Sequence, residues 1–182
     1  GAVVHNVGTA YAVYEAIQKN KPLFERVVTL TGKSVKKPSN FMVRIGTPVS
    51  NLIEAAGGLP ENSGKIINGG PMMGKAINSL EVPVVKGTSG ILIMPEDISA
   101  RKKQSTCIRC AKCVSVCPQG LEPYLLAKLA KLEKNDKLET GGVMDCIECG
   151  SCAYTCPAGL PLLDYIRLGK ARVSKIIRSR KQ

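Results

Sequence analysis

Hydrophobic and polar positions along the chain follow two different periods, and the change between them comes near residue 26. Before that point, apolar side chains recur at the three- and four-residue intervals of one helical face, at Ala12, Val13, Ala16 and Ile17. Thr9 is the expected N-cap of this helix, and Lys21-Pro22 is its expected end. The pattern therefore predicts a single helix within residues 1–25.

From residue 26 to residue 100 the pattern is typical of strands. A β-branched run at 27–31 ends at Gly32, and after a polar turn Phe41, Val43 and Ile45 alternate with period two. A short helix is expected with Thr47 as its N-cap and Pro48 as its first residue. Further strands are expected at 66–67, 82–85 and 91–94. This succession predicts an α+β domain of the β-grasp type over residues 26–100.

Residues 101–182 are expected to be helical and contain an internal repeat with an offset of 39 residues, in which 107–121 matches 146–160. A helix is predicted after each copy. The first, at about 122–134, carries on one face Leu125, Leu126, Leu129 and Leu132. The second begins near Pro161 and carries Leu162, Ile166, Val173, Ile176 and Ile177. The room for the first helix favours an α-helical ferredoxin-type domain over the compact β-hairpin type.

All eight cysteines of the chain lie in the two copies of this repeat, and each copy reads C-x2-C-x2-C-x3-C-P. This is the bacterial ferredoxin run that holds 4Fe–4S clusters, in which three thiolates bind one cluster and the fourth binds the other. The first cluster is therefore predicted on Cys107, Cys110, Cys113 and Cys156. The second is predicted on Cys146, Cys149, Cys152 and Cys117. No catalytic residue is predicted.

Other uses of the eight cysteines fit the pattern less well. Structural zinc sites take four sulfurs per ion, usually from two separated C-x2-C pairs. A disulfide framework is typical of small secreted chains, and no signal peptide opens this one. A cubane with four cysteine ligands has no open iron for a substrate, so its natural chemistry is one-electron transfer. A purely structural role for the clusters is the alternative.

The chain is strongly basic, with a formal charge of +12. Two oxidised clusters, each with a charge of about −2, would lower this to about +8. Such an excess indicates an acidic partner, an anionic membrane surface or nucleic acid. We expect no nucleic-acid partner, since the chain lacks the aromatic residues of a base-stacking surface. No apolar run reaches the roughly 18 residues of a membrane span. Because it begins at Gly1 without methionine, we interpret the chain as a fragment.

The last predicted helix is basic, with a single acid, Asp164, near its start. Its cations are Arg167, Lys170, Arg172, Lys175, Arg178, Arg180 and Lys181. An early acid and late bases suit the helix dipole. Two interpretations stay open: a solvated basic face, or a surface that contacts anionic lipid or an acidic subunit.

Three further features carry weaker hypotheses. His5 is expected to be a hydrogen-bonded structural residue. The loop Gly69-Gly70-Pro71-Met72-Met73-Gly74 lacks both phosphate-binding glycine motifs, and it is interpreted as a tight turn whose methionines fill an interface, or as a loop facing a flavin or a cluster. Arg109 in the first repeat corresponds to Glu148 in the second, so we expect the first cluster to have the higher potential, since a nearby cation stabilises the reduced state.

In the order of its parts, the chain resembles the C-terminal part of RnfC, a component of the Rnf (Rsx) electron transport complex. The resemblance rests on Asn6-Val7-Gly8-Thr9, the strand-rich segment with the 69–74 loop, the twin cysteine runs and the basic tail. Residues 1–25 resemble the end of a flavin- and NADH-binding domain. Residues 26–100 resemble the soluble-ligand-binding β-grasp (SLBB) domain, and residues 101–182 are the dicluster domain.

The resemblance implies a peripheral subunit on the cytoplasmic side of the bacterial inner membrane. The implied complex is an ion-translocating ferredoxin:NAD oxidoreductase, so the expected partners are its other subunits, a ferredoxin-type carrier and the membrane surface. Family members bind FMN and NADH through upstream glycine-rich segments that are absent here, so this chain is expected to hold two 4Fe–4S clusters without a complete nucleotide site. The alternative is an iron–sulfur electron-transfer subunit of a soluble flavoprotein oxidoreductase.

Overall fold

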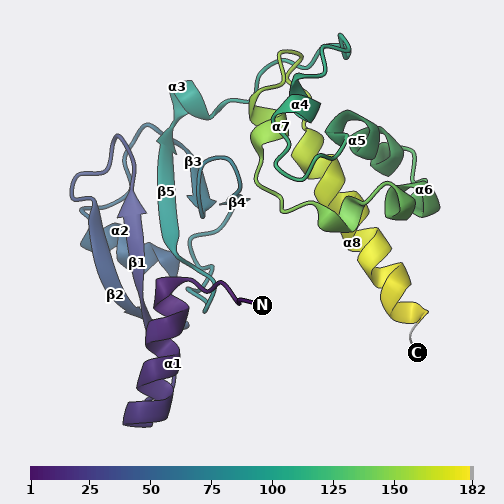
Figure 1. The fold of residues 1–182 in the computed structure, drawn as a ribbon. Coiled ribbons are helices and arrows are strands. Elements are labelled where there is room, and N and C mark those ends of the chain that lie inside the picture. The colour runs from purple at the N-terminus through teal and green to yellow at the C-terminus, as the bar shows by residue number, and fades with distance from the viewer. Residues whose placement is uncertain (181–182) are drawn as a thin grey trace. The chain divides into compact units, whose positions relative to one another are not determined.

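The computed structural model describes residues 1–180 of the chain (Figure 1). These residues divide into two compact units, one formed by residues 1–100 and the other beginning at residue 101. The first unit contains a five-stranded sheet and the second is helical.

The first helix, α1, spans Val7–Lys19 and begins earlier than its apolar pattern indicates. Asn6 is its N-cap, because the Asn6 side chain accepts a hydrogen bond of 2.9 Å from the Gly8 amide. The prediction of Thr9 as N-cap is therefore wrong. None of the residues of α1 is buried, so the apolar stripe containing Val13 and Ile17 faces solvent in this chain.

Five strands form one mixed sheet in the order β2-β1-β5-β3-β4. They are β1 (Glu25–Thr31), β2 (Ser39–Arg44), β3 (Ser63–Asn68), β4 (Lys75–Ile77) and β5 (Gly90–Pro95). The two central strands β1 and β5 are parallel, and the other neighbours are antiparallel. This topology is that of the β-grasp fold, so the predicted fold of the first unit is confirmed.

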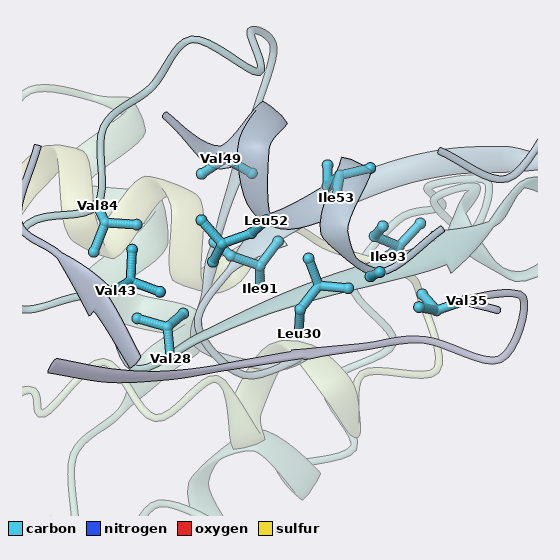
Figure 2. Packing of buried hydrophobic residues seen from close by; sticks show 11 residues of the cluster. Val28, Leu30, Val35, Val43, Val49, Leu52, Ile53, Val84, Ile91 and Ile93 are labelled. Atoms are coloured by element: carbon cyan, nitrogen blue, oxygen red, sulfur yellow. The ribbon is translucent and has the colours of Figure 1, made fainter. Parts of the chain in front are cut away.

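Helix α2 (Val49–Ala55) packs across one face of the sheet and closes its core. Val28 and Leu30 alternate with exposed residues on β1, so both point to this face. Figure 2 shows Leu52 and Ile53 of α2 directed toward the strand residues. The helix begins one residue later than predicted because Pro48, in extended conformation, is its N-cap.

Two strand predictions in the first unit are wrong. Residues 82–85 form no strand and make one isolated bridge, Pro48 to Pro83, although Val84 is fully buried. Pro83 has no backbone N–H, so this segment cannot continue a regular ladder. The short strand β4, in contrast, has too few residues for alternation to be visible in the sequence. After β5 the unit ends with the single turn α3 (Glu96–Ser99).

The second unit consists of helices and cysteine-bearing loops. The helices are α4 (Lys112–Ser115), α5 (Pro123–Lys131), α6 (Asn135–Thr140), the 3-10 turn η1 (Val143–Asp145), α7 (Ser151–Tyr154) and α8 (Leu162–Ser179). The predicted helix at 122–134 is too long, because Glu133 has a φ of 56° and the chain turns into α6. Leu132 is consequently exposed rather than part of the packed face.

The backbone reproduces the 39-residue repeat. Helices α4 and α7 begin 39 residues apart, and so do α5 and α8. The residues with positive φ also recur at this offset, as the pairs Arg109 and Glu148, Ala111 and Gly150, and Gly120 and Gly159. The two cysteine loops are therefore built with the same local conformations.

The helices of the two repeats cross at equivalent positions. Gly169 of α8 lies where an added Cβ would come within 2.9 Å of Ala130 Cβ and 3.0 Å of Leu138 Cδ1. Ala130 is the residue 39 positions before Gly169, and it is completely buried. The close approach of α5 and α8 therefore depends on a residue without a side chain at this point.

Candidate metal centre

Four cysteines from both repeats line one cavity of the second unit. Its volume is about 370 Å³ including its open mouth. The thiols are those of Cys117, Cys146, Cys149 and Cys152. Apolar side chains complete the wall, among them those of Leu126, Leu163 and Ile166. The four cysteines predicted to hold the second cluster thus border a single space, although they come from two segments 29 residues apart.

Backbone amides are directed at two of these sulfurs. The Leu121 amide donates to Cys117 Sγ and the Glu148 amide donates to Cys146 Sγ, both at 3.4 Å. Such N–H···S bonds stabilise thiolates and are among the factors that set the potential of an iron–sulfur cluster. A cavity with apolar walls, four thiols and amide donors fits a cubane cluster.

The thiols of this cavity differ in acidity because their surroundings differ. A hydrogen bond with Ser151, whose Oγ lies 3.5 Å from Cys149 Sγ, lowers the pKa of Cys149. Burial raises the pKa of Cys152 to about 11. Cys152 is therefore protonated at neutral pH in the metal-free chain, and cluster binding at this position has to release its proton.

The first predicted site is more open. Cys107 and Cys110 are exposed on the loop before α4, Cys113 is half-buried on α4, and Cys156 is buried after α7. Burial raises the pKa of Cys113, and the nearby thiol of Cys156 raises it further. This electrostatic effect requires Cys113 and Cys156 to be neighbours, as a shared cluster would demand.

All eight cysteines are free thiols, and none of them forms a disulfide. Within residues 1–180, no three side chains of the metal-binding types converge closely enough to hold one metal ion. This finding concerns a mononuclear site such as zinc, in which one ion binds every sulfur. In a cubane each thiolate binds a different iron, so the ligands surround a cavity instead.

The basic residues of α8 make contacts within the second unit that the sequence did not indicate. Arg167 Nε lies 2.8 Å from Glu148 Oε2, and Lys170 Nζ lies 3.7 Å from Glu148 Oε1. Lys170 Nζ also donates to the Cys146 carbonyl at 2.5 Å. The repeat itself contains the missing signal, since opposite charges stand at corresponding positions of loop and helix.

Further along α8, arginines bind the neighbouring helices. Arg172 donates to the Ala130 carbonyl at 3.1 Å and pairs with Glu133 at 2.9 Å. Arg180 pairs with Glu139 at 2.8 Å. Much of the positive charge expected to face solvent or a partner therefore holds the helices together. Lys175 and Arg178 are exposed, and Lys181 lies outside the described residues.

The remaining candidates of the sequence lie in the first unit. The 69–74 loop is a tight turn, as predicted, in which the Gly74 amide donates to the Gly70 carbonyl at 2.7 Å. A Cβ at Gly74 would come within 2.4 Å of the Ile67 side chain, so the turn folds closely against β3. Met72 and Met73 are exposed, and so is His5 before α1.

The β-grasp sheet and the repeated cysteine loops define a class: an iron–sulfur protein with a ligand-binding-type β-grasp domain and a dicluster domain. Comparison with protein families agrees with both parts. Residues 27–76 match the SLBB domain, and residues 99–157 match the 4Fe-4S dicluster domain. The fold predicted from the sequence and the presence of an iron–sulfur cluster domain are thereby confirmed.

Curated relatives match most of the chain, and all are RnfC-type components of their complexes. The one from the ion-translocating oxidoreductase complex of Yersinia enterocolitica is 48% identical over 174 residues, which are 95% of this chain and 25% of the relative. The one from the Na(+)-translocating ferredoxin:NAD(+) oxidoreductase complex of Acetobacterium woodii is 44% identical over 95% of this chain and 39% of the relative. The one from the proton-translocating ferredoxin:NAD(+) oxidoreductase complex of Clostridium ljungdahlii is 45% identical over 72% and 29%.

The chain belongs to the RnfC family of ion-translocating (Rnf-type) oxidoreductase complexes. It spans about a quarter to two fifths of the length of these relatives. Among residues 1–180, no helix combines the length and the apolar composition that crossing a bilayer requires.

Proposed function

We propose that the second unit binds two 4Fe–4S clusters and relays single electrons between them. The first is assigned to Cys107, Cys110, Cys113 and Cys156, and the second to Cys146, Cys149, Cys152 and Cys117. The observation that carries the proposal is the cavity lined by Cys117 together with three thiols of the other repeat. Exchange of the fourth ligand holds two clusters close to each other, which favours rapid transfer.

We further propose that this relay serves an ion-translocating ferredoxin:NAD oxidoreductase complex, the activity in the names of two relatives. Its partners would be the other subunits of the complex and a ferredoxin-type electron carrier. Residues 1–25 would be the end of a flavin- and NADH-binding domain, with FMN and NAD(H) bound by segments that are not in this chain. The exposed apolar stripe of α1 is consistent with a helix that packs against such a domain.

The proposed location is the cytoplasmic face of the bacterial inner membrane, as a peripheral subunit. Contact with the membrane surface would fall to the exposed cations Lys175 and Arg178, because several other basic residues of α8 are in ion pairs within the unit. Sedimentation with membranes, together with the partner subunits, distinguishes this location from that of a soluble flavoprotein partner.

The deciding experiment is iron and sulfide analysis of the anaerobically reconstituted chain, combined with EPR spectroscopy. Two cubanes require about eight irons and eight sulfides per chain and EPR signals from two reduced clusters. Binding of two zinc ions in place of iron would overturn the proposal.

A further inference from the structure

The second cysteine loop is attached to α8 by a group of three charged side chains, Glu148, Arg167 and Lys170. Glu148 follows Cys146 by two residues and precedes Cys149 by one, so its carboxylate belongs to the loop that holds the predicted ligands. Arg167 binds one of its oxygens at 2.8 Å, and Lys170 lies 3.7 Å from the other. Lys170 also donates to the carbonyl of Cys146. The loop and the helix are therefore joined at two points.

These three side chains are only partly accessible to solvent. Glu148 is 34% exposed, Arg167 21% and Lys170 25%, whereas the neighbouring pair of Arg101 and Asp164 is 66% and 48% exposed. Solvent and salt screen charge interactions less as burial increases. The charges of this group consequently act on their surroundings more strongly than those of a surface ion pair.

The first repeat lacks the acid of this group. At the offset of 39 residues, Glu148 corresponds to Arg109, Arg167 to Lys128, and Lys170 to Lys131. All three positions of the first repeat are therefore positive, and all three side chains belong to exposed residues. The attachment of the loop to the following helix through a carboxylate is thus possible only in the second repeat.

We propose that Glu148, Arg167 and Lys170 form a charge clamp that positions the second cysteine loop and sets the potential of the second cluster. This inference rests on the two-cluster function proposed above. The group contains two cations and one anion, so it places one net positive charge beside the cluster. A cation stabilises the more negative reduced cluster and raises its potential. The effect of Glu148 is therefore to cancel one of two cations, rather than to act as an isolated negative charge.

The proposal predicts opposite shifts for the members of the clamp. Glu148→Gln leaves both cations without an anion, so the midpoint potential of the second cluster should rise. Lys170→Gln and Arg167→Gln each leave the anion with one cation, so this potential should fall. Arg109→Gln is the matched control at the equivalent position, and it should affect only the first cluster.

The test is an anaerobic redox titration of the reconstituted chain and its four variants, with the two clusters resolved by EPR. Hydrogen exchange of the amides at 146–150 gives an independent readout of loop positioning. Faster exchange in Glu148→Gln and Lys170→Gln, but not in Arg109→Gln, is expected together with the opposite shifts in potential.

Shifts of the same sign in Glu148→Gln and Lys170→Gln, or no shifts, would overturn the proposal. Loss of iron from the second site in all three clamp variants would also overturn it, because the contacts would then only maintain the fold. If Glu148→Gln alone loses iron, the lysine and arginine variants decide by a fall or no change. Fewer than about eight irons in the unmodified chain would instead contradict the two-cluster function itself.

Discussion

Single side chains distinguish the two cysteine sites, although their spacing is identical. Cys107 and Cys110 are exposed, whereas Cys152 and Cys156 are buried in the core of the second unit. The fourth cysteine of each run is the residue that separates cross-ligation from two independent loops. Cys117 lines the cavity of the second repeat, so its substitution reports on this exchange directly.

Cys117→Ser is expected to weaken the cluster bound by Cys146, Cys149 and Cys152, and to leave the cluster of the first repeat in place. Cys156→Ser is the reciprocal variant and should weaken the other cluster. A serine oxygen is a poorer ligand for iron than a thiolate, so the affected site should lose iron or change its EPR signal. If each serine variant perturbed the cluster of its own run, the ligand assignment would be wrong.

Arg109 offers a second prediction at this scale. Arg109→Glu would give the first repeat the same combination as the second, an acid on the loop and two cations on the helix, at Lys128 and Lys131. The potential of the first cluster should fall, because the substitution replaces a positive charge by a negative one. A redox titration followed by EPR measures the change. An unchanged midpoint would contradict the hypothesis that Arg109 raises the potential of the first cluster.

At the scale of elements, the second unit depends on the crossing of α5 and α8. The crossing brings Gly169 against Ala130 and Leu138, with no room for a Cβ. Because these two helices carry the residues that follow each cysteine run, their separation would alter both sites. Packing at the crossing and ligand geometry are therefore linked.

Gly169→Leu is expected to destabilise the second unit by at least about 1–3 kcal/mol, the usual cost of forcing a larger side chain into a packed core. Ala171→Leu, at an exposed position of the same helix, should change stability by no more than about 0.5 kcal/mol. Anaerobic urea unfolding followed by circular dichroism measures both. Equal stability of the two variants would show that the helices can separate at this point at little cost.

At the scale of the whole chain, the two units have separate cores. The first is closed by strands and α2, and the second by helices and the buried cysteines Cys152 and Cys156. Since the predicted ligands all lie in the second unit, metal binding should stabilise that unit alone.

Removal of iron by a chelator under reducing conditions is expected to loosen residues beyond 101 and to leave the β-grasp sheet folded. Hydrogen exchange should accelerate at α4, α7 and the cysteine loops, while the amides of β1 and β5 remain protected. The sheet is the internal control in this experiment. Equal loss of protection in both units would show that they unfold as one cooperative body.

Much of the fold and of the candidate site could be predicted from local patterns. Helix boundaries were less predictable, because Asn6 and Glu133 determine them through a cap and a left-handed turn. The buried Val84 has the composition of a strand, but Pro83 interrupts the ladder. The charge of α8 was interpreted as a surface because its partners, Glu148 and Glu133 among them, are distant in sequence.

Local sequence was sufficient to establish the number of thiols, their spacing, the 39-residue repeat and the β-grasp type, because each of these depends on residues close together in the chain. The folded chain was needed to show which thiols share a cavity, where α5 and α8 touch, and which cations face Glu148. These depend on contacts between segments tens of residues apart, and such contacts are selected by packing and charge pairing over the whole unit rather than by any local pattern.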